Sequence, residues 1–245
     1  MSATRISPAW LAAVALVFVA DLVLHLPVTD LCDVIAARLG LRLYDRLAAV
    51  GFAVVGVATP IVIARWRAPA AGFLAVAATV LLGVALVVQK TLLVASIENI
   101  HYPQYALLVF LLGQGGLPTE LSWLLSLALG AVDEGYQWLF MPRGTFKYFD
   151  WNDVFLNAVG AAFGVVVLRL LSARTEAPFV SGRVVAAVLG VAWVATLLIA
   201  PPKTPFFSVT NAGIRYHVLS AFEGVLLIGL VWLGVRYIVR RSARD

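Results

Sequence analysis

The sequence predicts an all-α, polytopic integral membrane protein that folds as a bundle of about seven or eight transmembrane helices. Of its 245 residues, 62% are hydrophobic and only 13% are charged, whereas a soluble domain carries about 25% charged residues. The apolar residues are gathered in runs that approach bilayer length, since about 20 residues of helix cross the hydrocarbon. A chain of this composition cannot form a water-compatible surface, so we expect a multi-pass protein of the cell membrane.

Eight apolar segments are candidates for the transmembrane helices. The segment 102–115 is the shortest and ends in a glycine-rich turn, so it either crosses the membrane or enters it as a half-spanning segment. The first segment is interpreted as an uncleaved span that also serves as the insertion signal, because no convincing cleavage site follows it. The predicted spans are about 8–28, 47–64, 70–90, 102–115, 119–140, 153–171, 183–200 and 216–238.

The connection from Asp30 to Arg46 joins the first two spans. Its apolar residues recur at helical spacing, with aspartate and arginine between them. This pattern is typical of an amphipathic helix lying on the membrane surface. An ordinary basic loop is an equally good interpretation of the same residues.

Lys and Arg residues in the connections indicate the orientation. With eight spans, ten of them fall on the side of both termini and eight on the other, and the basic C-terminal run favours the first side as cytoplasmic. We therefore expect both termini in the cytoplasm. Because the basic residues are scattered between apolar segments, they indicate topology and no nucleic-acid partner. The single cysteine, Cys32, excludes an internal disulfide.

Under this topology the polar residues gather near the outer face. All three histidines fall there, and Asp21 precedes His25 by one helical turn. Glu223 is expected two turns into the last span, where a carboxylate needs a partner or a proton. Its candidate partners are Arg215, His217 and Arg143. The asymmetry predicts either an outward-facing polar pocket or ion pairs that hold the helix ends together.

The stretch from Gly130 to Val167 carries the densest polar pattern. One apolar run ends in Asp133 and Glu134, with Gln137 shortly after; a polar connection carries Arg143; and a second run opens with Asp153 and Asn157. Simpler interpretations exist for each. The acidic pair could meet water and an arginine, Asp153 could be a helix-start residue capped by Asn152 or Asp150, and Asn157 lies on the stripe of a Gly160-xxx-Gly164 close-packing motif.

Standard catalytic and nucleotide-binding motifs are absent from the sequence. Three scattered histidines give little support to a metal site. We therefore expect no cofactor and no bound metal, and the sequence leaves the oligomeric state open.

The central stretch resembles the VanZ-like membrane proteins, a family named for a teicoplanin-resistance accessory protein. The family pattern is an acidic pair, then Gln, an aromatic residue, P-x-R, Asp and N-x-x-G. An upstream element with His and Tyr is matched by His101 and Tyr105, while Ile97 and Glu98 stand where the family has an Asp-Lys pair. In this chain the central pattern reads Asp133-Glu134, Gln137, Phe140, Pro142-Arg143, Asp153, Asn157 and Gly160.

The resemblance covers about residues 89–172 and implies three regions. These are N-terminal helices with the amphipathic segment (1–88), a VanZ-like core (89–172) and C-terminal helices (173–245). It also implies a role in the cell envelope, linked to glycopeptide (teicoplanin) resistance, and one functional cluster. That cluster would contain His101, Tyr105, Asp133, Glu134, Gln137, Arg143, Asp153 and Asn157.

The leading hypothesis is that this cluster binds a lipid headgroup or a lipid-linked cell-wall precursor. Arg143 and Lys147 would hold an anionic group, and Asp133 and Glu134 would share or exchange a proton. A second hypothesis is a membrane-embedded hydrolase or transferase that uses His101 with Asp133 or Glu134. A third is a structural network of ion pairs at the helix ends, without catalysis.

Overall fold

A computed structural model describes residues 7–93, 96–140, 149–171, 208–211 and 214–243, together with residues 187 and 190. A short 3-10 helix, η1 (Ser96–Ile100), leads directly into α4, and β1 (Ser208–Asn211) pairs with β2 (Ile214–His217) in an antiparallel hairpin. The predicted all-α membrane bundle is confirmed, with this small hairpin added. The helices are α1 (Pro8–Leu39), α2 (Leu41–Ala64), α3 (Ala71–Thr91), α4 (His101–Gln114), α5 (Thr119–Phe140), α6 (Trp151–Leu171) and α8 (Ala221–Ser242).

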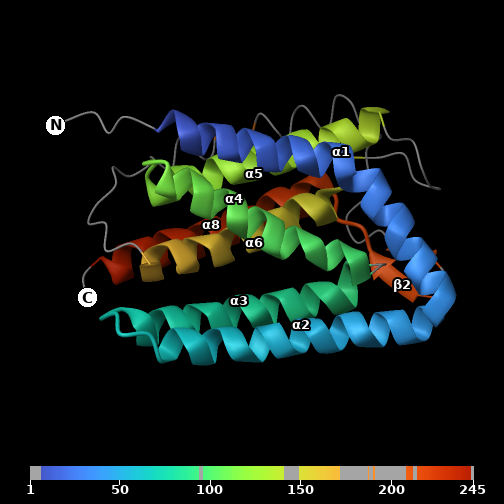
Figure 1. The fold of residues 1–245 in the computed structure, drawn as a ribbon, viewed down its shortest axis with the longest axis horizontal. Coiled ribbons are helices and arrows are strands. Elements are labelled where there is room, and N and C mark those ends of the chain that lie inside the picture. The colour runs from blue at the N-terminus through green and yellow to red at the C-terminus, as the bar shows by residue number, and fades with distance from the viewer. Residues whose placement is uncertain are drawn as a thin grey trace.

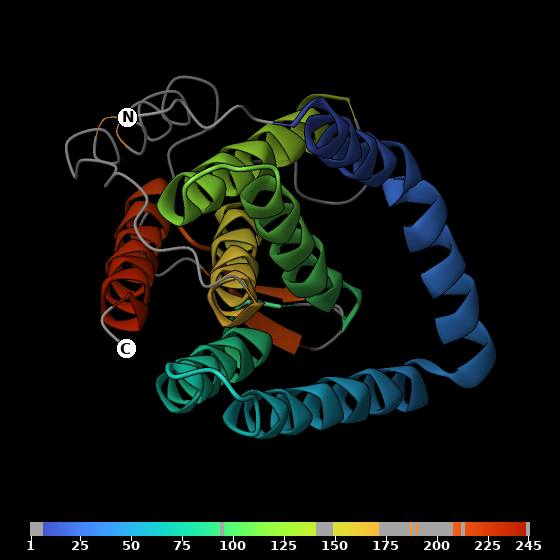
Figure 2. The ribbon, with the colours of Figure 1, turned by 60° about the vertical axis from the view of Figure 1, so that its left-hand side comes forward.

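The helices run roughly side by side along the long axis of the molecule, and α6 lies at their centre (Figures 1 and 2). α6 packs against α3, α4, α5 and α8 and is buried on nearly every side. Its small residues allow this position, because a helix without bulky side chains on a face can approach its neighbours closely. α1 and α2 lie outside this core, since α1 packs on α4 and α2 packs on α3.

Five described helices are long and apolar enough to cross a membrane: α1, α2, α3, α6 and α8. This is fewer than the seven or eight spans that the sequence predicts. α4 has only 14 residues, and the 22 residues of α5 include Glu120, Asp133 and Glu134, which lower its hydropathy. The span predicted at 183–200 lies outside the described residues, except for positions 187 and 190.

The connection from residue 30 to residue 46 is helical throughout, apart from a turn at Gly40. α1 continues for 32 residues through Pro27 to Leu39, and α2 begins at Leu41. α1 changes direction partway, and its second half runs down one end of the bundle to α2 (Figures 1 and 2); a proline inside a helix causes such a bend. The loop interpretation is therefore wrong. The amphipathic segment is helical, but it is divided between two long helices.

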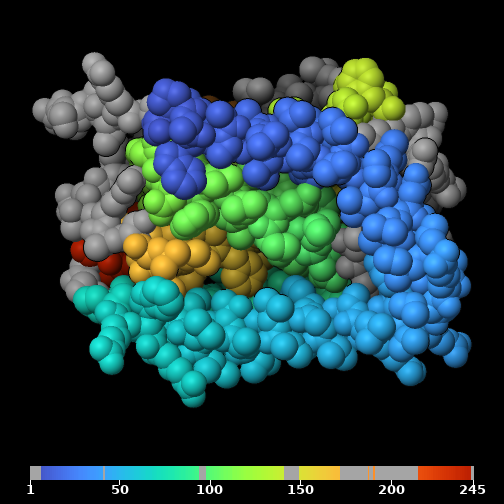
Figure 3. All heavy atoms as spheres, viewed as in Figure 1, coloured from blue at the N-terminus to red at the C-terminus, as the bar shows by residue number. Residues whose placement is uncertain are grey.

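α1 and α2 form a frame along three edges of one face, with α4 and α6 visible between them (Figure 3). Their apolar side chains are largely exposed: Val23, Val54 and Val57 each retain more than 60% of their accessible surface. Exposed apolar surface of this extent suits contact with lipid tails. α1 and α2 are thus suited to face lipid, as are the exposed apolar faces of α3 and α8.

The last helix begins later than the sequence predicts. Residues 216 and 217 belong to β2, and α8 begins at Ala221 behind a capping box. The Ser220 hydroxyl accepts from the Glu223 N–H at 3.3 Å, and the Glu223 carboxylate accepts from the Ser220 N–H at 2.8 Å. Glu223 therefore lies in the first turn of α8, and not two turns into a span. Its predicted partner His217 is confirmed, with Nε2 3.0 Å from Glu223 Oε1.

Asn152 joins the chain segments that meet at this end of the bundle. Its side-chain Nδ2 donates to the carbonyl oxygens of Leu92 (3.0 Å) and His217 (2.9 Å), and its Oδ1 accepts from the Leu219 N–H at 2.8 Å. The end of α3, the hairpin, the start of α6 and the approach to α8 are therefore fixed relative to one another by one buried amide.

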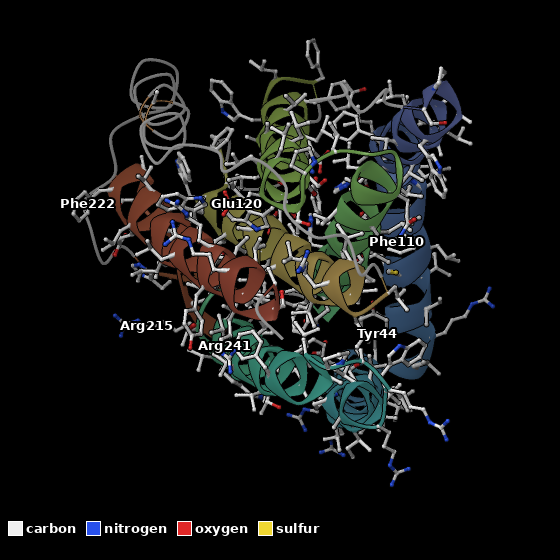
Figure 4. All side chains as sticks on the ribbon, turned by 90° about the vertical axis from the view of Figure 1, so that its left-hand side faces the viewer. Tyr44, Phe110, Glu120, Arg215, Phe222 and Arg241 are labelled. Atoms are coloured by element: carbon white, nitrogen blue, oxygen red, sulfur yellow. The ribbon has the colours of Figure 1, made fainter. Side chains whose placement is uncertain are left out.

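The opposite end of the bundle contains the start of α1 and the end of α8 (Figure 1). The Ser7 N–H donates to the Gly115 carbonyl at 3.1 Å, which ties the start of α1 to the end of α4. Glu120 lies between α5, α6 and α8 in the end-on view (Figure 4). Its Oε1 is 3.6 Å from Arg236 Nε, and the Arg236 guanidinium lies 4.8 Å from the centre of the Trp232 ring.

Candidate functional site

Most of the predicted site residues lie at the end of the bundle where α4 and α6 begin and α5 ends. His101 is the first residue of α4, Asp133 and Glu134 stand in the last two turns of α5, and Asp153 is in the first turn of α6. We call His101, Tyr105, Asp133, Glu134, Asp153 and Asn157, with Asp21 of α1, the polar cluster. Three helices of the bundle core and α1 therefore contribute to one region.

His101 stands between a carboxylate and an aromatic ring. Its Nε2 is 4.0 Å from Asp153 Oδ2. Its ring stacks on that of Tyr105, one turn further along α4, with 6.1 Å between centroids and 22° between planes. The Tyr105 hydroxyl in turn donates to Asp133 Oδ2 at 3.3 Å. The imidazole and the α5 carboxylate are thus connected through one tyrosine.

Asn157 and Tyr105 occupy the space beside Gly130 of α5. A Cβ atom at Gly130 would lie 2.8 Å from Asn157 Nδ2 and 3.0 Å from Tyr105 Cε1. Such contacts are too close for a side chain, so the glycine is required for Asn157 and Tyr105 to sit where they do. Gly130 is a site residue that the sequence pattern did not single out.

The Gly160-xxx-Gly164 motif brings α4 against α6. A Cβ at Gly160 would lie 2.8 Å from the backbone of His101 and Tyr102, and one at Gly164 would lie 2.5 Å from the Ala106 carbonyl. The close-packing interpretation of the motif is therefore confirmed. It also positions the site, because the backbone of His101 rests directly on Gly160.

Most of the cluster is buried inside the protein. Asp133, Glu134 and Asn157 retain 1%, 3% and 0% of their accessible surface, and His101 is also buried. The interpretation in which the acidic pair simply meets water is therefore wrong for both carboxylates. Buried carboxylates are costly unless they are protonated, paired or bound to a ligand.

α1 adds a fourth carboxylate to the cluster. Asp21 accepts a hydrogen bond from Gln104 of α4 and lies close enough to Asp133 and His101 for electrostatic interaction. Asp133 also interacts electrostatically with Asp153, and Glu134 with both. Sequence spacing pairs Asp21 with His25. Asp21 and Gln104 are 83 positions apart, so no local pattern signals their contact.

Several buried polar atoms of the cluster have no well-aligned hydrogen-bond partner. They are Nδ1 of His101, Oδ1 of Asp133 and both amide atoms of Asn157. A side-chain interaction links Asn157 to His101, so its amide lies beside the imidazole. Native proteins leave few buried polar atoms unsatisfied, and a group of such atoms commonly indicates a functional site.

The remaining predicted residues fall into three groups. Gln137 lies beside the cluster and its Nε2 is 3.5 Å from Glu134 Oε1. Arg143 and Lys147 lie outside the described residues. His217 forms its own pair with Glu223, and Asp150 accepts from the Asn152 N–H at 2.9 Å as a cap of α6.

Within the described ranges, no three His, Cys, Asp or Glu side chains are arranged to hold a metal ion.

The chain was compared with known proteins. The family model described as VanZ/LLP1 matches residues 47–172, just over half of the chain. The matched range runs from within α2 to the end of α6, and it includes all the members of the polar cluster except Asp21. Neither the curated proteins nor the solved structures give a match. The extent of the family match shows that this membrane protein belongs to the VanZ/LLP1 family.

Proposed function

We propose that this protein is a cell-envelope member of the family whose polar cluster binds the headgroup of a membrane lipid or of a lipid-linked cell-wall precursor. The observation that carries the proposal is the set of unsatisfied atoms on His101, Asp133 and Asn157 inside the bundle. A ligand that supplies hydrogen-bond partners would remove the cost of burying them.

A lipid is favoured as the ligand by the surroundings of the cluster. Asp21 belongs to α1, and the exposed faces of α1 and α2 are apolar, so the cluster adjoins surface suited to acyl chains. In this proposal the protein lies in the cell membrane with both termini in the cytoplasm, which places the cluster toward the outer leaflet. Arg143 and Lys147 remain our candidates for holding a phosphate or carboxylate of the ligand.

The lipids that co-purify with the protein test this function. We expect Asp133→Asn and Glu134→Gln to lose most of a lipid species that the wild-type chain retains, because each change replaces a carboxylate with an amide of nearly the same volume. Asp33→Asn is the matched control, since Asp33 is an exposed carboxylate of α1. Lipid content is measured by mass spectrometry of native complexes. Equal content in the wild-type chain and the three variants would contradict the proposal.

The family link to glycopeptide resistance defines a cellular readout. We expect expression of the chain to raise the teicoplanin tolerance of a susceptible host, and Glu134→Gln to abolish that effect at an unchanged protein level. If the wild-type chain does not change the teicoplanin tolerance of the host, the link to resistance is wrong. The lipid-binding part of the proposal would then depend only on the co-purification test.

The geometry of His101 favours a second candidate function, a membrane-embedded hydrolase or transferase. A carboxylate lies 4.0 Å from Nε2 while Nδ1 has no well-aligned partner, and an imidazole oriented by a carboxylate can act as a general base. The orienting group is Asp153, and not Asp133 or Glu134 as the sequence suggests. This candidate predicts that the His101→Gln protein keeps its bound lipid but no longer raises teicoplanin tolerance. A His101→Gln protein that keeps both the lipid and the tolerance would contradict it.

A further inference from the structure

The polar cluster is rich in carboxylates and poor in cations. Asp21, Asp133 and Asp153 lie close enough to His101 to interact with its imidazole, and Glu134 lies near Asp133 and Asp153. Within the described part of the chain, none of the four carboxylates accepts from lysine or arginine. The buried arginine pair of the bundle, Arg236 with Glu120, involves the first turn of α5 and the last turns of α8.

Such a cluster favours a ligand that brings positive charge. Burying an ionised carboxylate away from a counter-charge costs several kcal/mol even after relaxation. A negatively charged group entering the cluster would increase that cost, and a positively charged group would lower it. The phosphate of a lipid is therefore the wrong part of the headgroup to occupy this position.

The unsatisfied atoms specify the chemistry further. Asp133 Oδ1 and Asn157 Oδ1 are acceptors buried to 1% and 0% exposure without a well-aligned partner. Asn157 and Tyr105 both lie beside Gly130, and Asn157 interacts with His101, so the Asn157 amide lies within the cluster. A primary ammonium group carries three N–H donors. A quaternary ammonium carries none, and the described residues show no metal-binding arrangement for an inorganic cation.

We infer that the cluster binds the primary ammonium group of a lipid-anchored headgroup, as in an aminophospholipid. The inference rests on the proposed lipid-binding function and names the part of the headgroup that the cluster recognises. Asp133, Glu134 and Asp153 supply the charge, Asn157 and Asp133 accept hydrogen bonds, and α1 closes the cluster with Asp21. A lipid-linked precursor that bears a primary amine presents the same chemistry.

Reconstitution with defined lipids tests the inference. The delipidated full-length chain is titrated with phosphatidylethanolamine, its N-acetyl derivative, phosphatidylcholine and phosphatidylglycerol, all with the same acyl chains. Binding is read by native mass spectrometry and by thermal stabilisation. We expect phosphatidylethanolamine to bind about tenfold more tightly than the other three, because a charge-assisted hydrogen bond contributes enough for that ratio. Asp153→Asn and Glu134→Gln should each remove the preference, while Asp33→Asn should keep it.

The alternative outcomes are distinct. A cluster-dependent preference for phosphatidylglycerol, or equal binding of the N-acetyl lipid, would overturn the ammonium inference and leave lipid binding standing. Stabilisation by free ethanolamine equal to that by the lipid would show a soluble amine to be the ligand and overturn the lipid part. If no lipid depends on the cluster, both the inference and the proposed function fail.

Discussion

Two asparagines of α6 show how the same residue type serves structure and function at different positions. Asn152 and Asn157 are both buried. Asn152 makes three hydrogen bonds of good geometry to backbone groups of other segments, whereas both amide atoms of Asn157 lack a well-aligned partner. Asn152 therefore holds the fold together, and Asn157 is available to a ligand.

This contrast gives a matched prediction. We expect Asn152→Ala to lower the free energy of unfolding by about 2–4 kcal/mol, because it leaves three backbone groups unsatisfied. Asn157→Ala should change it by less than about 1 kcal/mol and should reduce lipid retention. Thermal unfolding in detergent measures both variants, and equal destabilisation would show that Asn157 is a structural residue too.

Much of the site was predictable from the sequence at this scale. Polar residues that interrupt apolar runs drew attention to this stretch, since such residues are rare without a role. The family resemblance grouped Asp133, Glu134, Asp153, Asn157 and His101 into one cluster. The Asp21–Gln104 contact was not predictable, because it joins helices far apart in the chain. The three partners of Asn152 are backbone groups, and a sequence pattern does not record those.

At the scale of elements, the glycine stripe of α6 sets the distance to α4. The site depends on that distance, because His101 and Tyr102 rest on Gly160. The motif was recognisable from its four-residue spacing. The partner helix was not, since small-residue stripes fit many neighbours.

Enlarging this stripe should separate the two helices. Gly164→Ala places a Cβ 2.5 Å from the Ala106 carbonyl oxygen, and we expect a loss of about 1–3 kcal/mol of stability from overpacking. Gly83→Ala in α3 is the control, because a Cβ there meets no atom within 4 Å and alanine is the better helix former. Thermal unfolding of the two variants compares them, and a Gly164→Ala protein as stable as Gly83→Ala would refute the close contact.

The capping box at α8 supports a second prediction at this scale. Ser220→Ala removes the hydroxyl that accepts from the Glu223 N–H, so we expect a loss of about 1 kcal/mol. Ser220→Thr, which retains a hydroxyl, should lose less. Equal thermal shifts for the two variants would contradict a role for the cap. The hairpin that precedes α8 was not predicted, because two four-residue strands are too short to show an alternating pattern.

At the scale of the molecule, the bundle has two different ends. One gathers the polar cluster and the hairpin, and the other gathers the start of α1, the end of α8 and the α2–α3 connection (Figure 1). Composition was sufficient to predict a helical membrane bundle. The number of spans was not, because α4 is short and α5 is interrupted by acidic residues. The division of the chain at residues 88 and 172 stays a prediction.

The orientation of the bundle is testable by cysteine labelling. Single cysteines are introduced in a Cys32→Ser background. Arg67→Cys and Arg240→Cys probe the end of the bundle where α1 starts, and Arg42→Cys and Arg215→Cys probe the opposite end. All four positions are exposed. We expect an impermeant thiol reagent added to intact cells to label positions 42 and 215 only. The opposite pattern would invert the orientation, and a mixed pattern would contradict the bundle.

The most direct test of the central claim asks whether a lipid headgroup reaches His101. The chain has three histidines, so the 15N imidazole signals can be assigned by His25→Gln and His217→Gln. During titration with a short-chain phosphatidylethanolamine, we expect the His101 signal to shift in the wild-type chain and to stay unchanged in Glu134→Gln. A His101 signal that does not respond to any lipid would show that the polar cluster is not the binding site.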